Sequence, residues 1–123
     1  MRVLVCEDNL VNQAVMRALL NRLGHRTEFV GNGMEGLLLL EQETFDVVLM
    51  DIEMPVMDGF ETVRRIRLSE SSGTLRHQYI IAVTAHALQG MRERCIAASM
   101  DDFITKPLNR VALSNALSRV PRR

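Results

Sequence analysis

The side chains best suited to ionic chemistry each follow a short apolar run, and these runs lie far apart in the chain. They are Glu7, Asp8, Asp51, Thr84 and Lys106, the last of which precedes Pro107. In an open parallel sheet the C-terminal ends of the strands lie along one edge, so residues separated by dozens of positions can share one pocket. Three acids, a hydroxyl and an amine at one edge are the groups expected of a site for a cation and a phosphate.

The three acids favour a divalent cation. A single carboxylate after the first strand could simply cap the first helix, and for Glu7 or Asp8 alone that explanation is sufficient. Asp51 ends a second apolar run, however, and three carboxylates crowded into a small volume repel one another unless a cation neutralises them. An all-oxygen site of this kind suits Mg²⁺, for which Mn²⁺ is expected to substitute.

Lys106 and Thr84 are the candidates for contacting a phosphate at the same edge. Taken alone, Lys106 could be a surface lysine, and Thr84 could cap the following helix. At a strand end, however, the ammonium group could pair with Asp51 at rest, or with a phosphoryl group once one is attached. The Thr84 hydroxyl could bond an oxygen of that group. The conjunction of residues, rather than any one of them, predicts the site.

The elements that must position these residues follow the pattern of a parallel sheet covered on both faces. Residues 3–6, 47–50 and 80–83 are unbroken apolar runs, which indicate central strands. Residues 26–30 alternate between polar and apolar side chains, and residues 103–104 form a brief run after two acids. Both are therefore expected at the edges of a five-stranded sheet.

Helical patterns separate the strands. The first runs over residues 11–23, with Asn9 as the expected N-cap and Gly24 where a left-handed C-terminal cap is expected. The others are expected at residues 33–43, 59–69, 88–100 and 108–120, and residues 69–78 are expected to form a surface loop. Strand and helix alternate throughout, which predicts a three-layer α/β sandwich with five strands and five helices.

Composition and length narrow the classes of function. The 123 residues carry 15 basic and 15 acidic side chains, so one domain over residues 1–123 is expected, without nucleic acid or an anionic membrane as partner. The apolar run at residues 37–40 is far too short to cross a bilayer, and the N-terminus lacks a signal-peptide pattern. Cys6 and Cys95 lie in apolar segments, which favours reduced, buried thiols and a cytoplasmic location.

Taken together, the motifs at the strand ends resemble those of a known family. They are Glu7-Asp8-Asn9, Asn12-Gln13, Asp51, Met54-Pro55, Met57-Asp58-Gly59, Val83-Thr84-Ala85 and Thr105-Lys106-Pro107. In this order and spacing, over residues 2–120, the chain resembles the receiver domains of two-component signalling, specifically those attached to hybrid sensor histidine kinases. The resemblance implies a flavodoxin-like sheet with strand order 2-1-3-4-5.

The resemblance also implies roles for the matching residues. Asp51 is implied to be the phosphoacceptor, and Glu7 and Asp8 are implied to hold Mg²⁺ together with Asp51 and the backbone carbonyl of Glu53. Thr84 and Lys106 are implied to contact the phosphoryl group. The resemblance further implies that Phe103 occupies the aromatic switch position, in concert with Thr84, and that the peptide bond between Lys106 and Pro107 is cis.

The function implied by the resemblance is phosphoryl transfer in a phosphorelay. The domain takes a phosphoryl group from a phosphohistidine on a histidine kinase in a Mg²⁺-dependent reaction that it catalyses itself. It then switches the surface of its last two helices and last strand, or passes the group to a histidine phosphotransfer domain. It is expected to be a monomer or a weak phosphorylation-dependent dimer without direct membrane contact. The chain is expected to be a stand-alone regulator or part of a hybrid kinase, which could be an inner-membrane sensor.

Four positions depart from the usual family pattern or invite a specific hypothesis. Phe103 stands where many relatives have tyrosine, so its ring can bury completely and bias the switch inward. Ser99 stands where relatives often have glycine, which predicts either a positive φ or a differently ended helix. Glu53 and His86, each two residues past a key site residue, are expected to tune the lifetime of the phosphoryl group by controlling access of water.

Other classes of protein use some of the same residues. Phosphohydrolases of the haloacid dehalogenase type also use an aspartate, a threonine, a lysine and Mg²⁺, but they carry a second aspartate where this chain has Glu53, and a cap domain for which no room remains. Pseudo-receivers lack an acid, the acceptor or the lysine, all of which are retained here. A flavin or nucleotide carrier would need a glycine-rich phosphate loop where this chain places Glu7 and Asp8.

Overall fold

The computed structural model describes residues 1–54, 56–85 and 90–121, and within them strands and helices alternate. The strands are β1 (Arg2–Cys6), β2 (Arg26–Val30), β3 (Val47–Asp51), β4 (Ile80–Thr84) and β5 (Asp102–Thr105). The helices are α1 (Leu10–Arg22), α2 (Gly33–Gln42), α3 (Gly59–Ser71), α4 (Met91–Ala97) and α5 (Arg110–Ser118). The strands are parallel, in the order β2-β1-β3-β4-β5. The predicted fold class and strand order are confirmed.

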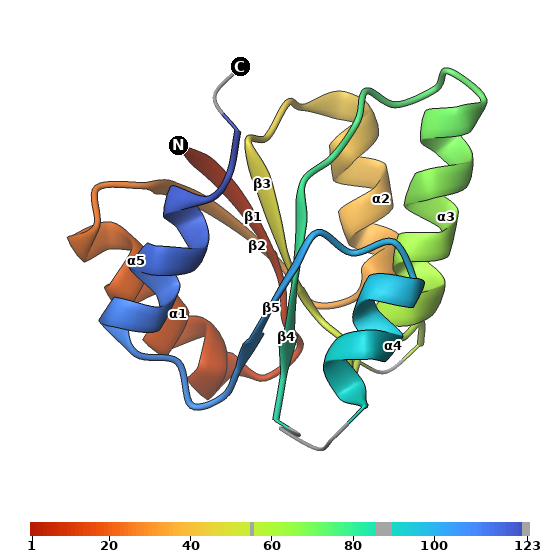
Figure 1. Ribbon diagram of the computed structural model, residues 1–123. Coiled ribbons are helices and arrows are strands. Elements are labelled where there is room, and N and C mark those ends of the chain that lie inside the picture. The colour runs from red at the N-terminus through yellow and green to blue at the C-terminus, as the bar shows by residue number, and fades with distance from the viewer. Residues whose placement is uncertain (55, 86–89, 122–123) are drawn as a thin grey trace.

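The sheet is the middle of three layers, as Figure 1 shows, with α1 and α5 on one face and α2, α3 and α4 on the other. Every residue of β3 and β4 is buried, and so are four of the five residues of β1. No residue of β2 is fully buried, because β2 lies at the edge of the sheet. The unbroken apolar runs therefore did mark the central strands, and the alternating run marked an edge.

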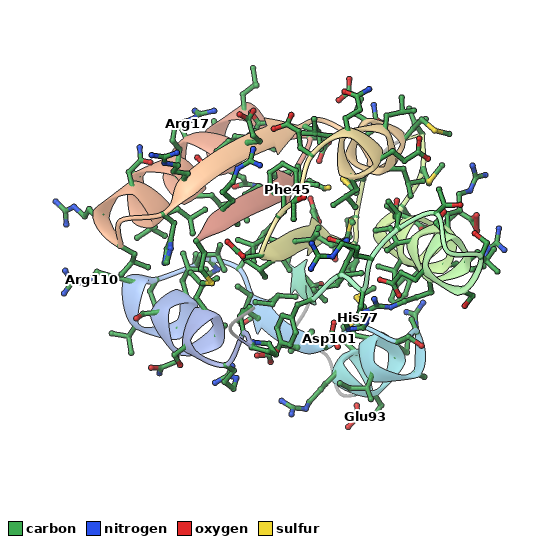
Figure 2. All side chains as sticks on the ribbon, turned by 90° about the horizontal axis from the view of Figure 1, so that it is seen from above. Arg17, Phe45, His77, Glu93, Asp101 and Arg110 are labelled. Carbon is green, nitrogen blue, oxygen red and sulfur yellow. The ribbon has the colours of Figure 1, made fainter. Side chains whose placement is uncertain are left out.

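The core consists of two apolar clusters, one on each face of the sheet. Most of their side chains are aliphatic or methionine, and Phe45 is the one aromatic residue among the largest fully buried side chains of the described part of the chain. Viewed along the strands, charged side chains such as Arg17, Glu93 and Arg110 lie at the outside of the layers (Figure 2). Polar and charged side chains that are buried within this core are few, so each of them needs an explanation.

Side chains at the start of four helices cap their backbone amides. Asn9, Asn32, Asp58 and Asn109 each accept a hydrogen bond from the amide three residues later. At its other end, α1 closes on Gly24 with a φ of 83°, as the sequence predicted. Two backbone bonds accompany this turn, from the amides of Gly24 and His25 to carbonyls of the last helical turn. This is the Schellman arrangement, in which a left-handed residue satisfies the last carbonyls of a helix.

The fourth helix differs most from its predicted bounds. A helix was expected over residues 88–100; its expected start lies outside the described residues, and α4 ends at Ala97. The expected continuation to Met100 is wrong because Ser99 has a φ of 69°, which reverses the chain. The amides of Ser99 and Met100 donate to the carbonyls of Ile96 and Cys95, in the same arrangement that ends α1. The predicted positive φ at Ser99 is confirmed.

No helix among the described residues is both long enough and apolar enough to cross a bilayer.

Candidate functional site

The C-terminal ends of β1, β3, β4 and β5 lie along one edge of the sheet, where the parallel register brings the candidate residues together. Cys6 pairs with Met50, so the residues that follow β1 lie beside Asp51 at the end of β3. Asp51 in turn pairs with Val83, immediately before Thr84. The predicted convergence of strand ends is therefore present in the fold.

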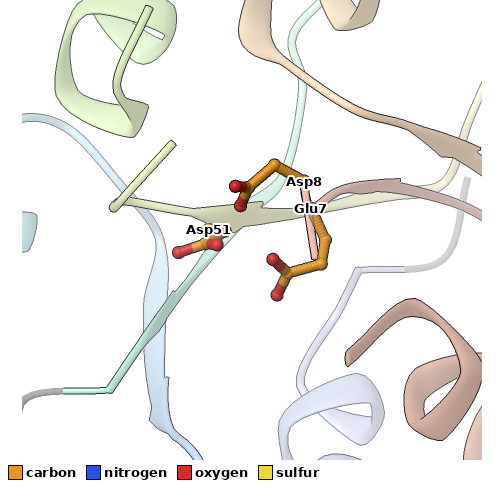
Figure 3. A group of neighbouring side chains, drawn as sticks. All are labelled: Glu7, Asp8 and Asp51. Atoms are coloured by element: carbon orange, nitrogen blue, oxygen red, sulfur yellow. The ribbon is translucent and has the colours of Figure 1, made fainter. Parts of the chain in front are cut away.

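Glu7, Asp8 and Asp51 form an acidic cluster. One carboxylate oxygen from each lies within 4.8 Å of the others, and Figure 3 shows the three carboxyl groups gathered at the ends of β1 and β3. Glu7 and Asp51 are almost completely buried, with 0% and 1% of their surface exposed, whereas Asp8 is exposed. Two buried carboxyl groups side by side are unfavourable unless a cation or a shared proton offsets their repulsion.

Lys106 supplies a cation to this cluster. Its Nζ lies 2.8 Å from Glu7 Oε1 and 3.2 Å from Asp51 Oδ2. Burial alone would lower the pKa of Lys106, but the hydrogen bond with Glu7 and the attraction of both carboxylates raise it above its ordinary value. Lys106 is therefore charged at neutral pH. The peptide bond that joins it to Pro107 is cis.

One ammonium group does not neutralise two buried acids, and the remaining imbalance shifts their pKa values apart. Burial, with a hydrogen bond and repulsion from Glu7, raises the pKa of Asp51 from 3.8 to about 7. Burial also acts to raise the pKa of Glu7, but hydrogen bonds with Asp51 and Lys106 lower it overall. Without a bound cation, Asp51 is therefore the member of the pair that stays protonated until the pH rises to about 7.

Hydrogen bonds from two backbone amides and from the Gln13 side chain hold the acids in place. The Asn9 amide donates to Glu7 Oε2 at 3.1 Å, and the Gln13 side chain donates to the Glu7 carbonyl at 2.6 Å. The Glu53 amide donates to Asp51 Oδ1 at 2.9 Å. Both acids are thus oriented by the turn that follows their own strand, so the cluster does not depend on distant flexible segments.

The loop after β3 is held against the sheet by a close approach at the start of α3. A Cβ atom on Gly59 would lie 2.5 Å from the Cα of Ile52, so only glycine fits there. The Gly59 amide also donates to the Ile52 carbonyl at 3.2 Å. Within this loop Val56 has a φ of 69°, which is a strained conformation for a β-branched residue. The turn that carries Glu53 is therefore strongly constrained.

The donor set fits a hard divalent cation. All three acidic side chains offer oxygen, and the exposed Asp8 leaves one side of the cluster open to water. Glu7 Oε1 is buried, and the contact that it makes is the ion pair with the ammonium group of Lys106 at 2.8 Å. An oxygen left in this state retains the capacity to coordinate a metal or a metal-bound water. Glu7, Asp8 and Asp51, with the Glu53 carbonyl, would hold Mg²⁺.

Thr84 and Phe103 lie on the neighbouring strands β4 and β5, and their roles in a switch remain predictions. Thr84 is completely buried at the end of β4, and its hydroxyl donates to Glu53 Oε1 at 2.7 Å. Phe103, in β5, is partly buried and packs against the core on the α4 side of the sheet. His86 lies outside the described residues, so its proposed tuning role has no structural counterpart here.

Sequence reasoning missed two contributors to the site. Gln13 was noted only as part of a motif, but its side chain anchors the Glu7 backbone; its position one turn into α1 could have indicated this. The contact of the Glu53 side chain with Thr84 has no signal in the sequence, because it joins residues 31 positions apart through a particular rotamer.

Comparisons with known proteins agree with this geometry. The family described as "Response regulator receiver domain" matches residues 3–118, and the chain belongs to this family. Hybrid signal transduction histidine kinase M of Dictyostelium discoideum is 37% identical over 120 residues, which cover 96% of this chain and 5% of that protein. The chain spans about 5% to 15% of the length of histidine kinases such as this one, Probable histidine kinase 1 of Oryza sativa subsp. indica and Histidine kinase 5 of Arabidopsis thaliana.

Solved structures give the same result. The receiver domain of sensor histidine kinase PA1611 from Pseudomonas aeruginosa PAO1, solved with a magnesium ion in its active-site cleft, is 42% identical, with a TM-score of 0.85 over 97% of this chain and 95% of that one. The receiver domain in the complex of Ypd1 with Ssk1 from Saccharomyces cerevisiae is 27% identical, with a TM-score of 0.90 over 98% and 88% of the two chains. The chain is thus a two-component receiver domain with an acidic cluster like a magnesium site.

Proposed function

We propose that Asp51 accepts a phosphoryl group from a phosphohistidine in a Mg²⁺-dependent reaction. The observation that carries this proposal is the position of Asp51, which lies at a strand end in contact with the Lys106 ammonium group and beside the acids Glu7 and Asp8. A carboxylate so placed can act as a nucleophile at phosphorus while the Lys106 ammonium group offsets the charge of the transferring group, and a bound Mg²⁺ would add to that effect.

The residues of the chain have distinct tasks in this transfer. An Asp51 carboxylate oxygen forms a bond to phosphorus as the bond between phosphorus and the histidine nitrogen breaks, and the electron pair of that bond stays on the imidazole. Lys106 balances charge on the phosphoryl oxygens, and Glu7 keeps Lys106 oriented before transfer. Mg²⁺, when bound, supplies further charge neutralisation and orientation of the phosphoryl oxygens. The domain thereby catalyses its own phosphorylation and dephosphorylation, and it is not an enzyme acting on a free substrate.

We further propose that the phosphoryl group changes the surface formed by α4, β5 and α5. It adds roughly one negative charge beyond the original carboxylate at pH 7, and it offers new acceptor oxygens to Thr84 and Lys106. Movement of Thr84 would open space for Phe103, which is already partly buried. The change is a shift between two populated states, with a coupling of about 1–3 kcal/mol if it is typical.

The proposed partners are a histidine kinase domain and a histidine phosphotransfer domain. Apolar side chains near the mouth of the site support a protein partner, since Leu10 and Val11 at the start of α1 are 78% and 72% exposed and Val56 is 88% exposed. A small hollow of about 90 Å³ beside Glu7 and Lys106 lies between α1 and the chain after β5. The Ypd1–Ssk1 complex shows that a related receiver domain binds a phosphotransfer protein. We propose a cytoplasmic location, within a hybrid kinase.

The test is covalent labelling of Asp51. Incubation with acetyl phosphate and Mg²⁺, followed by intact mass measurement, should add one phosphoryl group to the wild-type chain and none to Asp51→Asn. Stoichiometric labelling supports a receiver, whereas rapid repeated turnover of small phosphate esters would support a phosphohydrolase instead. An unlabelled wild-type chain would contradict the proposal.

A further inference from the structure

The carboxylate of Glu53 accepts hydrogen bonds from two donors at the end of β4. The Thr84 hydroxyl donates to Glu53 Oε1 at 2.7 Å, and the Ala85 amide lies 3.4 Å from Glu53 Oε2. Thr84 is completely buried, whereas Glu53 is exposed to solvent. A hydroxyl and a backbone amide that converge on one anionic group form the kind of donor pair that also binds phosphoryl oxygens.

The backbone brings Glu53 to these donors. Asp51 pairs with Val83, and the Ile52 amide extends the ladder by donating to the Val83 carbonyl at 3.1 Å. The chain then turns at Glu53, whose amide donates to Asp51 Oδ1 at 2.9 Å. Because this turn fixes the Glu53 backbone beside the acceptor, the side chain of Glu53 reaches across from the end of β3 to the end of β4.

We infer that the carboxylate of Glu53 competes with the phosphoryl group on Asp51 for the hydrogen bond that the Thr84 hydroxyl can donate. The inference rests on the proposed function, in which that group accepts a hydrogen bond from Thr84. The Thr84 hydroxyl has a single proton to donate, so it cannot serve Glu53 and a phosphoryl oxygen equally at the same time. The two groups also repel each other, since a phosphoryl group carries roughly two negative charges at pH 7. Glu53 must therefore release Thr84 before the switch is complete.

This competition gives Glu53 a role that differs from controlling the access of water. Glu53 is a positioning residue: it holds Thr84 in the resting arrangement and opposes the phosphorylated one. Removing the carboxylate should therefore favour the phosphorylated arrangement, and the gain should require the Thr84 hydroxyl. A general effect of charge on the metal or on the incoming phosphodonor would not require that hydroxyl.

The experiment measures the apparent affinity for beryllofluoride, which stands in for the phosphoryl group on Asp51, by NMR titration in saturating Mg²⁺. Glu53→Ala should tighten binding on the order of tenfold, the value of one charge-assisted hydrogen bond, and Glu53→Gln should tighten it less. In a Thr84→Val background, which lacks the hydroxyl at nearly constant shape, Glu53→Ala should change the affinity less than about twofold. In a Thr84→Ser background, which retains a hydroxyl, the gain should return.

The outcomes separate this inference from the proposed function. Equal tightening by Glu53→Ala in the wild-type and Thr84→Val backgrounds would show that Glu53 acts through charge alone and would overturn the inference. So would an unchanged affinity in the wild-type background. Either result leaves the phosphoacceptor role of Asp51 intact, because wild-type chain still binds beryllofluoride. A wild-type chain that neither binds beryllofluoride nor is labelled by acetyl phosphate overturns the proposed function and the inference with it.

Discussion

Asp51 and Glu7 are both almost completely buried and lie side by side, so only one of them can readily be charged. Lys106 lies closer to Glu7 than to Asp51, at 2.8 Å against 3.2 Å, and the Asn9 amide also donates to Glu7. These contacts favour the charge on Glu7 and leave the proton to Asp51. A bound cation removes this preference, because it favours the ionised form of both carboxylates. The resting site therefore stores an electrostatic cost that metal binding removes.

A consequence at the scale of one residue is a particular pH dependence of stability without metal. The pKa of Asp51 is raised from 3.8 to about 7 in the folded chain. A group with a raised pKa contributes stability that is present below its unfolded pKa and is lost as the pH rises through its folded pKa. Relative to the wild type, Asp51→Asn should therefore gain about 2 kcal/mol in free energy of unfolding between pH 5 and pH 8.

Urea unfolding in EDTA at several pH values measures this difference. The lowered pKa of Glu7 acts in the opposite direction, but its effect falls below its ordinary value of 4.5, outside this window. A difference between wild type and Asp51→Asn that stays constant from pH 5 to pH 8 would show that Asp51 ionises normally. Asp46→Asn provides a control, because Asp46 immediately precedes β3, at the opposite end of that strand from Asp51.

At the scale of elements, the end of α4 is fixed by an unusual backbone residue. Ser99 adopts a φ of 69°, in the position that Gly24 and Gly73 occupy after α1 and α3. A residue with a Cβ atom pays a conformational penalty of about 1–2 kcal/mol there, whereas glycine does not. The helix α4 is part of the proposed switch surface. The conformational penalty at Ser99 therefore lies at the end of an element that is expected to move.

Ser99→Gly should therefore stabilise the domain by about 0.5–1 kcal/mol, the relieved penalty less the greater entropy of glycine in the unfolded chain. Thermal and urea unfolding measure the change. The matched control is Ser114→Gly in the exposed middle of α5, which should lose about 0.5 kcal/mol. Loss of stability in both variants would mean that Ser99 pays no penalty in its native conformation.

A second feature at this scale is the guanidinium group of Arg67, which ties three segments together. It donates to the Ser99 carbonyl from Nε at 3.0 Å and from Nη2 at 2.8 Å, and to the Gln78 carbonyl at 2.8 Å. It also pairs with Glu70 at 2.6 Å and with Asp101 at 3.0 Å. The end of α3, the chain before β4 and the turn after α4 are thus held by one planar group.

Arg67→Lys should destabilise the domain by about 2 kcal/mol, because lysine keeps the charge but cannot reproduce the fork of donors. Urea unfolding tests this against Arg65→Lys, which alters an exposed ion pair with Glu61 and should change stability by no more than about 0.5 kcal/mol. Equal effects of the two substitutions would mean that the contacts of Arg67 contribute no more than a surface ion pair.

At the scale of the whole molecule, much of the fold follows from sequence pattern because burial imposes it. The runs at residues 47–50 and 80–83 are apolar on both faces since helices cover both faces of β3 and β4. The convergence of Glu7, Asp51 and Lys106 follows from the parallel sheet itself. The contact between Glu53 and Thr84 could not be predicted, because it depends on rotamers across two strands. The roles of these residues remain predictions.

The exposed apolar surface at the start of α1 should matter for transfer from a protein phosphodonor but not for labelling by a small-molecule phosphodonor. Changing both Leu10 and Val11 to serine should slow transfer from a histidine kinase or phosphotransfer domain on the order of tenfold, because a partner must cover these side chains. Labelling by acetyl phosphate, which needs no docking surface, should be unchanged. Leu38→Ser on α2, on the other face of the sheet, is the control and should affect neither reaction. Equal slowing with both donors would place the defect in the site itself.

Binding of Mg²⁺ should stabilise the whole domain by mass action. At a Mg²⁺ concentration about 100 times its dissociation constant, the gain should approach 2.7 kcal/mol, which is a rise of several degrees in Tm. The rise should be larger at pH 8 than at pH 6, because at pH 6 the metal must displace the proton on Asp51.

Thermal unfolding in MgCl₂, in MnCl₂ and in NaCl of matched ionic strength measures the gain, with Asp8→Asn as the matched variant. Asp8 is exposed, so its replacement should leave the apo domain folded while removing one of the three acidic ligands. Both Mg²⁺ and Mn²⁺ should stabilise the wild type, and the gain should fall sharply in Asp8→Asn. A rise in Tm that NaCl reproduces, or that Asp8→Asn retains in full, would mean that the metal does not bind at Glu7, Asp8 and Asp51, and the charge stored in that cluster would then need another partner.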